Sequence, residues 1–316
     1  MKQPSKFTVV YIMGRGHSGS TVLDIILDNH KDIQGVGELT SGFGFRSNTE
    51  RCACQAPLDE CDFWASIRQR LEQLHPETDL DEYSKMMNYI ARFYRIPQIK
   101  TKLGLPAWLS EYDSMTYDLY SLISRQSDRS YIVDSSKEIA YAYYLLVRFP
   151  GDAKVIHLVR DGRGVMWSRL RRLQAGQPFQ FLRRYLIPKR HWAFMILTVL
   201  SWNFANIVGI LLRLLHKDQV LEVRYEDFCG NPSKELMRIG EFLNLDMAEL
   251  VEQMEKNQPL RIGHTIAGNS MRHSPSGTFT FKPDYAWRKH LPMRYKVLFL
   301  LLAFPLAVYY GYLHEN

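Results

Sequence analysis

The apolar positions near the N-terminus change period within twenty residues. Residues 7–13 are β-branched, aromatic or aliphatic with no polar alternation, a pattern typical of a parallel strand buried on both faces. A glycine-rich run occupies residues 14–19, and residues 22–27 then carry apolar side chains at helical spacing. The pattern predicts a strand, a glycine turn and a helix in that order.

The same alternation continues along the chain. Apolar runs that end in polar residues are followed by stretches with helical spacing, such as 138–149 and the residues after 162. Strands alternating with helices favour a parallel sheet with helices on both faces. The sequence therefore predicts a three-layer α/β sandwich with a central parallel sheet, whose further strands lie at 33–38, 131–137, 154–160 and 220–227.

Two regions depart from this alternation. Residues 41–129 contain no strong strand signal, and 63–74 and 83–94 have helical spacing, so we expect a helical insertion that covers the site or shapes a substrate pocket. Nothing between the motifs resembles a linker, and a chain of 316 residues with 46% hydrophobic content can bury one large core. We therefore expect one domain over residues 1–316, with an apolar helix at 291–316.

Two stretches are unusually apolar. The first, 193–215, is long enough to span a bilayer, but it contains Asn203 and Asn206, so we interpret it as a core helix rather than a membrane span. The second, 297–312, is interrupted by Pro305, which favours a packed or interfacial helix.

Charge adds a preference for anionic partners. The formal net charge is +7, which favours a nucleotide, acidic lipid headgroups or an acidic substrate, and no nucleic-acid-binding motif accompanies it. The N-terminus leads directly into the first strand, so we expect a cytoplasmic protein. Basic residues near the apolar stretches suggest peripheral contact with an anionic membrane and a lipid-linked or amphipathic acceptor; they are Arg169, Arg171, Arg172, Arg183, Arg184, Lys189 and Arg190. The sequence gives no signal for the oligomeric state.

Three of the four cysteines are close together, at Cys52, Cys54 and Cys61. A zinc site would need a fourth ligand, for which Cys229 and His75 are distant candidates. A disulfide is the second alternative, although it is unexpected in a reducing cytosol. Thiols packed under a neighbouring tryptophan, with no metal, are the preferred interpretation.

The glycine run fits three chemistries. Gly14 and Gly19 have Walker A spacing, but Ser20 occupies the lysine position, so an ATP- or GTP-hydrolysing P-loop enzyme is weakly supported. A dinucleotide fingerprint is matched by Gly14, Gly16 and Gly19, with Glu38 near the expected distance for a ribose-binding acid. The third option is a loop for a 5′-phosphosulfate group, which usually has a basic residue before Ser-Gly-[Ser/Thr]-Thr.

A second anion site separates these options. Arg160 ends a predicted strand, and Ser168 lies eight residues later in the next helix. A guanidinium can hold a phosphate through two hydrogen bonds while a hydroxyl adds a third. The alternative is an ordinary surface pair between Arg160 and Asp161.

The chain as a whole resembles the sulfotransferases that use 3′-phosphoadenosine 5′-phosphosulfate (PAPS), in particular the branch with tyrosylprotein sulfotransferases and many bacterial enzymes. The matches run in order over most of the length: His17-Ser18-Gly19-Ser20-Thr21, Gly37-Glu38, Asp134-Ser135-Ser136-Lys137, Val159-Arg160-Asp161-Gly162-Arg163 with Ser168, Trp202-Asn203, Tyr225-Glu226-Asp227 with Asn231-Pro232, and Gly268-Asn269-Ser270-Met271-Arg272.

The resemblance implies roles for these residues. Glu38 would be the base, and Lys137 would assist at the sulfuryl group together with His17. Arg160 and Ser168 would hold the 3′-phosphate, and no metal would be required. The full predicted cofactor-binding set is Arg15, Gly16, His17, Ser18, Gly19, Ser20, Thr21, Arg160, Ser168, Tyr225 and Arg272. For Tyr225 and Arg272, ordinary packing and a surface-loop position are the respective alternatives.

His17 departs from the family pattern, which has Lys or Arg there, so a permanent charge is replaced by a titratable one. Arg15, two residues earlier, is a candidate to supply the missing charge. Three roles stay open for His17: a hydrogen-bond donor, a proton carrier or a packing residue. We expect a PAPS-dependent sulfotransferase acting on a hydroxyl of a carbohydrate, a lipid-linked molecule, a tyrosine or a small metabolite. The alternatives are a nucleotide kinase-like P-loop enzyme, an NAD(P) oxidoreductase and an inactive nucleotide-binding or membrane-associated module.

Overall fold

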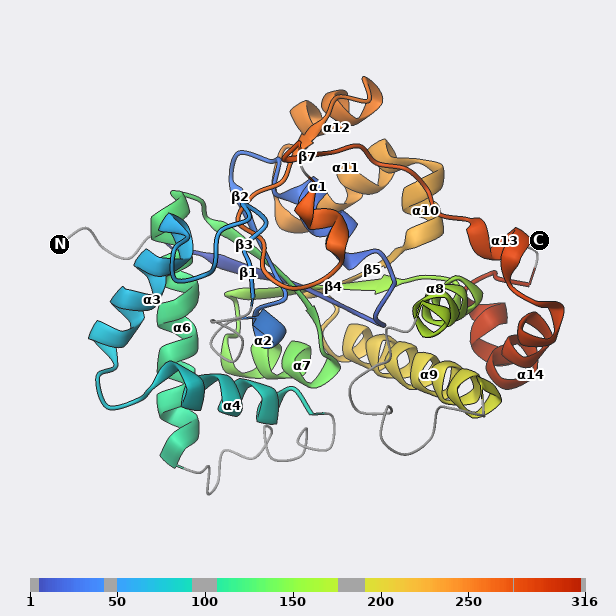
Figure 1. Cartoon of the computed structure of the whole chain (residues 1–316), viewed down its shortest axis with the longest axis horizontal. Coiled ribbons are helices and arrows are strands. Elements are labelled where there is room, and N and C mark those ends of the chain that lie inside the picture. The colour runs from blue at the N-terminus through green and yellow to red at the C-terminus, as the bar shows by residue number, and fades with distance from the viewer. Residues whose placement is uncertain (1–5, 43–49, 93–106, 176–190, 275, 314–316) are drawn as a thin grey trace.

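A parallel sheet forms the centre of the molecule (Figure 1). The computed structural model describes residues 6–42, 50–92, 107–175, 191–274 and 276–313, and within them five strands pair in the order β2-β3-β1-β4-β5, all parallel. The strands are β1 (Thr8–Gly14), β2 (Ile33–Gly37), β3 (Tyr131–Lys137), β4 (Ala153–Val159) and β5 (Val220–Arg224). The predicted α/β fold with a central parallel sheet is confirmed.

Helices cover both faces of the sheet, because successive side chains of each strand point to opposite sides. Tyr11 and Met13 of β1 join the core with α6 (Ala107–Ser127) and α7 (Ile139–Arg148). Val10 and Ile12 join the opposite core, with α1 (Ser20–Leu27) and α11 (Pro232–Leu243). The remaining elements are α2 (Leu39–Gly42), α3 (Asp62–Leu74), α4 (Leu80–Ile90), α8 (Gly162–Gln174), α9 (His191–Leu215), α10 (Tyr225–Gly230), α12 (Ala248–Glu255), the β6 (Leu260–Arg261) and β7 (Thr278–Phe279) pair, η2 (Ser270–His273), α13 (Ala286–His290) and α14 (Met293–Tyr309).

Between β2 and β3 the described residues form α2, α3, α4 and α6. The last three pack with α7 on one face of the sheet (Figure 1). This is the segment expected as a helical insertion, and the division of the chain into one domain with an insertion stays a prediction.

The prediction for the fifth strand was wrong at its end. The strand stops at Arg224 and α10 begins at Tyr225, because Glu226 turns inward and its Oε1 accepts a hydrogen bond of 3.0 Å from the Asp161 amide. The helix thereby fixes the start of the loop after β4.

Helix α9 has the length and apolar composition of a membrane-crossing helix, and among the described residues it is the one helix that does. Its inner side packs on β1, β5, α7, α8 and α14. Trp202 is buried there and donates to the Arg160 carbonyl at 2.9 Å, and Asn206 contacts the buried His157 at 3.2 Å. One side of α9 is thus part of the core.

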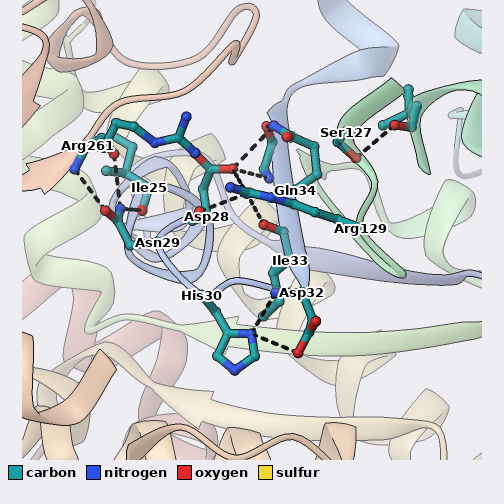
Figure 2. A network of polar contacts seen from close by, with 12 residues as sticks. Ile25, Asp28, Asn29, His30, Asp32, Ile33, Gln34, Ser127, Arg129 and Arg261 are labelled. Atoms are coloured by element: carbon teal, nitrogen blue, oxygen red, sulfur yellow. Dashed lines mark hydrogen bonds and ion pairs between the residues drawn. The ribbon is translucent and has the colours of Figure 1, made fainter. Parts of the chain in front are cut away.

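A polar network fastens the end of α1 to the sheet (Figure 2). Asp28 is fully buried and its Oδ1 accepts hydrogen bonds from the Gly35 amide at 2.8 Å and from Gln34 at 3.2 Å. Arg129 donates to the same oxygen at 3.0 Å and also to the Ile33 carbonyl. Burial raises the pKa of Asp28 to about 6, and the Gly35 and Arg129 contacts oppose that rise. The network joins the helix of the glycine loop to β2 and β3.

Replacing Arg129 with methionine should lower the free energy of unfolding by about 3 kcal/mol, because it leaves the buried Asp28 carboxylate with only the more distant and largely exposed Arg261, at 3.6 Å, as a cation. The loss should grow as the pH rises above about 6, since the pKa of Asp28 rises further without Arg129 and the carboxylate must then ionise without its closest cation. Urea denaturation at several pH values measures both effects. Arg125→Met, at an exposed position of α6, is the control and should change stability by less than about 0.5 kcal/mol. Equal effects of the two substitutions would contradict the prediction.

Candidate functional site

The predicted site residues gather at one edge of the sheet. Glu38 follows β2, Lys137 ends β3, Arg15 follows β1, Arg160 follows β4 and Tyr225 follows β5. The strands are parallel, so their carboxyl ends meet at the same edge, where open α/β sheets bind ligands. Side chains more than two hundred residues apart in the sequence, such as Arg15 and Tyr225, therefore lie at one edge of the sheet.

The glycine loop has the backbone of an anion cradle. His17 and Gly19 both adopt left-handed conformations, with φ of 76° and 97°, and the amide and hydroxyl of Ser18 both donate to the Arg15 carbonyl. The first amides of α1 follow directly and have no carbonyl partner inside the helix. A β-carbon at Gly16 would meet no atom within 4 Å, so the loop is open there. Such a loop binds phosphate or sulfate groups.

The loop is closed on its other side by Tyr225. A β-carbon at Gly19 would lie only 2.7 Å from the Tyr225 ring, so close packing, in addition to the positive φ, requires glycine there. The same ring lies under the guanidinium of Arg160, at 4.5 Å from its centroid. Tyr225 thus connects the glycine loop to the second predicted anion site.

His17 is a neutral residue in this environment. Burial, together with the neighbouring cations, of which Arg169 contributes most, lowers its pKa to about 3. The side chain of Arg15 is held by α9, because its Nε donates a hydrogen bond to the Ser201 hydroxyl at 3.1 Å. Positive charge at the loop therefore comes from surrounding arginines and Lys137 rather than from the imidazole.

Glu38 and Lys137 form an ion pair through Oε1 and Nζ. Both side chains are partly exposed, at 14% and 17%, so the pair remains open to a ligand. Lys137 has a φ of 74°, a left-handed conformation that costs a non-glycine residue on the order of 1–3 kcal/mol and is concentrated at functional sites.

A residue of α1 aligns this pair. Asp24 is buried, and its Oδ2 accepts hydrogen bonds from the Gly37 amide at 2.9 Å and from the Ser135 hydroxyl at 2.7 Å. Gly37 precedes Glu38, and Ser135 lies two residues before Lys137. Asp24 therefore ties the ends of β2 and β3 to the helix of the glycine loop.

Arg160 contacts the glycine loop, and Ser168 lies in α8, the helix that follows Arg160. Arg160 donates to the His17 carbonyl at 3.0 Å and to Asp284 at 2.8 and 3.1 Å, while its Nε is buried without a hydrogen-bond partner. Ser168 is also buried, and no described residue hydrogen-bonds to its hydroxyl. The alternative pair with Asp161 does not form, because Asp161 binds Arg163 at 2.7 Å.

The segment 263–268 lies over the Glu38 side of the site. The Glu38 amide donates to the Ile266 carbonyl at 2.8 Å, and a β-carbon at Gly268 would lie 3.1 Å from both Glu38 Oε1 and Thr21 Oγ1. The segment therefore packs directly on Glu38 and on the start of α1.

Arg272, at the end of the same region, has other contacts. It pairs with Glu50 and donates to the Arg51 and Thr265 carbonyls at 2.6 and 3.2 Å. Among the described residues it does not contact Arg160 or Ser168. The structure therefore brings Arg272 to the Glu38 side of the site, and its predicted role at the 3′-phosphate stays a prediction.

Sequence reasoning missed three residues that position the site: Asp24, Ser201 and Asp284. Each acts through a contact across 100 residues or more, such as the 124 residues between Arg160 and Asp284. No local motif marks any of them, so only the folded chain identifies them.

Comparisons with known proteins find a matching family and similar folds. The sequence matches the family described as the sulfotransferase family over residues 10–249, and no curated protein matches it. A similar solved structure is the sulfotransferase domain of the olefin synthase from Synechococcus PCC 7002, with 19% identity, a TM-score of 0.50 and coverage of 97% of each chain. Others are a sulfotransferase from Mycobacterium tuberculosis (13% identity, TM-score 0.48, 79% of this chain and 71% of that one) and retinol dehydratase in complex with androsterone and the inactive cofactor PAP (14%, 0.43, 96% and 82%).

Proposed function

Because this chain belongs to the sulfotransferase family and is a sulfotransferase enzyme, we propose that its donor is PAPS and its acceptor a hydroxyl group. The hydroxyl belongs to a carbohydrate, a lipid-linked molecule, a tyrosine or a small metabolite. The transfer is an in-line displacement at sulfur that needs no metal ion in the chemical step.

Two separate anion sites at one sheet edge carry the proposal for the donor. The glycine loop suits the 5′-phosphosulfate of PAPS, and Arg160 with Ser168 suits its 3′-phosphate. The residues present fit this molecule, because the buried Nε of Arg160 has no partner and no described residue hydrogen-bonds to the Ser168 hydroxyl. A donor with one phosphate would leave that buried nitrogen unsatisfied.

Each residue then has a distinct task in the reaction. When bound, PAPS supplies a sulfuryl group on a phosphate leaving group. Glu38 accepts the proton of the acceptor hydroxyl, while Lys137 orients Glu38 and donates to oxygens that gain charge. The loop amides and the arginines hold the phosphate, which is mainly positioning and charge stabilisation.

Calorimetric titration without magnesium tests the donor. The product nucleotide 3′-phosphoadenosine 5′-phosphate (PAP) should bind more tightly than 5′-AMP, ATP or NADP, because it alone carries the two phosphates at the required positions. Tighter binding of ATP with magnesium would favour a kinase-like P-loop enzyme. Tighter binding of NADP would favour an oxidoreductase. PAP binding without sulfuryl transfer to any hydroxyl acceptor would favour the inactive module.

We further propose a cytoplasmic enzyme that contacts anionic membrane through α9 and α14. These helices lie side by side (Figure 1), with Asn203 donating to the Leu302 carbonyl at 2.7 Å. Both helices expose large apolar residues, and groups of such residues mark interaction sites: Trp192, Leu197, Leu200, Phe204, Ile207, Leu211, Leu214 and Leu215 from α9, and Met293, Val297, Leu301, Phe304, Val308 and Tyr309 from α14.

Charge near this surface supports a membrane as the partner. Arg171, Arg172 and Arg294 are exposed and can attract anionic headgroups. Arg169 is buried, and Arg183, Arg184, Lys189 and Arg190 lie outside the described residues.

Vesicle flotation tests the membrane contact. The protein should bind phosphatidylserine vesicles at low salt and phosphatidylcholine vesicles much less, and Leu301→Glu should weaken that binding. Leu74→Glu, at an exposed leucine of α3, is the matched control. The proposal would be contradicted if the wild type did not bind anionic vesicles, or if the two variants bound them equally.

A further inference from the structure

Three cysteines and a histidine converge outside the sulfuryl-transfer site. The free thiols of Cys52, Cys54 and Cys61 and the imidazole of His264 offer four ligand atoms that all lie within 4.8 Å of one another. We propose that they form a structural zinc site of the Cys₃His type. This inference is independent of the proposed function.

The distances match the edges of a zinc coordination tetrahedron. Zinc lies about 2.3 Å from sulfur and about 2.0 Å from nitrogen, which places two sulfurs about 3.7 Å apart and a sulfur and a nitrogen about 3.5 Å apart. Cys54 Sγ lies 3.6 Å from Cys61 Sγ. His264 Nδ1 lies 3.3 Å from Cys61 Sγ and 3.6 Å from Cys52 Sγ. The Cys54 and Cys61 sulfurs are therefore too far apart for a disulfide, whose bond is about 2.05 Å.

The backbone around the first two cysteines is built as a tight hairpin. Arg51 and Pro57 pair as an antiparallel bridge, the Cys52 amide donates to the Ala56 carbonyl at 3.0 Å, and the Gln55 amide donates back to the Cys52 carbonyl at 2.9 Å. Gln55 takes the left-handed φ of 76° that the turn needs. The turn brings Cys52 and Cys54 to one side.

The other two ligands are oriented by the start of α3. Cys61 directly precedes this helix, and the Trp64 amide hydrogen-bonds to its sulfur, as the Cys54 amide does to that of Cys52. The His264 ring stacks on Phe63 with centroids 5.0 Å apart, and the Trp64 indole donates to the His264 carbonyl at 2.8 Å. Amides that bind the sulfurs and groups that orient an imidazole are typical of metal sites.

The chemistry of the ligands selects zinc. Three thiolates and one imidazole in a tetrahedral arrangement with no open position suit a structural zinc ion. The two distant candidates for a fourth ligand do not join the cluster: His75 binds Asp118 at 2.9 Å, and Cys229 belongs to α10. His264 lies 203 residues from Cys61 in the chain, so no spacing pattern reveals it.

The site would join two segments that are far apart in sequence. The Ala53 amide donates to the Thr265 carbonyl at 3.0 Å, so the hairpin already lies on the segment that covers Glu38. Metal binding contributes directly to the stability of the structure that it joins. Zinc would therefore hold residues 263–268 in place next to Glu38. The effect of this on catalysis rests on the proposed function.

Metal analysis of purified, reduced protein tests the site. The wild type should carry a single zinc ion per chain, and Cys52→Ser and His264→Asn should lose it. Cys229→Ser removes the one cysteine outside the cluster and should keep the zinc. Equal zinc content in all four proteins, or none in the wild type after incubation with zinc, would overturn the inference.

Cobalt substitution gives a test that does not depend on folding of the variants. Wild type depleted with a chelator and refilled with Co²⁺ should show the intense visible absorption of tetrahedral cobalt and a thiolate charge-transfer band, both removed by Zn²⁺. Chelation should also lower the melting temperature. Absence of these bands in reduced protein, or a Cys54–Cys61 disulfide found by mass spectrometry, would contradict a zinc site, whatever the result of PAP titration.

Discussion

Glu38→Gln should lower kcat by roughly 10²–10⁴-fold, the contribution of a well-placed general base. Glutamine keeps the size of the side chain and can still contact Lys137, but it cannot accept the proton of an acceptor hydroxyl. PAP does not use that proton, so its affinity should be nearly unchanged. Initial rates with labelled PAPS and a hydroxyl acceptor found by screening, together with PAP titration, measure both quantities.

A matched control separates this role from a general loss of charge. Glu60→Gln changes an exposed glutamate in the loop before α3 and should leave kcat unaltered. Lys137→Met should also slow the reaction, and the double variant should lose less than the product of the two losses, since Lys137 contacts Glu38. A Glu38→Gln enzyme with wild-type kcat would remove Glu38 from the chemical step.

Arg160→Met should weaken PAP binding by about 100-fold, because it removes charged hydrogen bonds worth on the order of 1.5–3 kcal/mol. The affinity for 5′-AMP should fall much less, since this nucleotide lacks the 3′-phosphate. Calorimetric titration of both nucleotides into both proteins measures the difference, which is specific to the 3′-phosphate.

Two further variants sharpen this result. Ser168→Ala should weaken PAP binding by about tenfold, as the loss of a single hydrogen bond to a charged group predicts. Arg171→Met, at an exposed position of the same helix, should leave it unchanged. Equal losses for PAP and 5′-AMP in Arg160→Met would show that Arg160 acts by holding the His17 carbonyl instead.

Most of the fold was predictable because buried parallel strands leave a strong local signal. Apolar runs located β1 to β4 closely, and polar residues at their ends placed Glu38, Lys137 and Arg160 on one edge. The end of β5 was not predictable, since Tyr225 suits a strand as well as a helix. Its place is decided by Glu226, whose carboxylate binds the distant Asp161 amide.

Site residues that belong to a sequence motif were predictable. Residues that join the site only through a contact in the folded chain were not. Nothing local shows that Asp284 faces Arg160 or that His264 meets three cysteines. The charge state of His17 was equally hidden, because burial among arginines, rather than the residue type, lowers its pKa. His17 is therefore interpreted as a neutral residue in the ligand-free chain.

The hydrogen bonds of Asp24 have a consequence for the rate of the proposed reaction. One carboxylate oxygen binds the backbone beside Glu38 and the hydroxyl two residues before Lys137, and its own helix begins at the glycine loop. The glycine loop and Glu38 therefore cannot drift apart independently during thermal motion. Fixing reacting groups in this way converts an encounter of two molecules into an internal event, which can supply about 7–11 kcal/mol of a barrier. In the proposed reaction, that entropic advantage would depend on Asp24, a buried side chain with no assigned role in the chemical step.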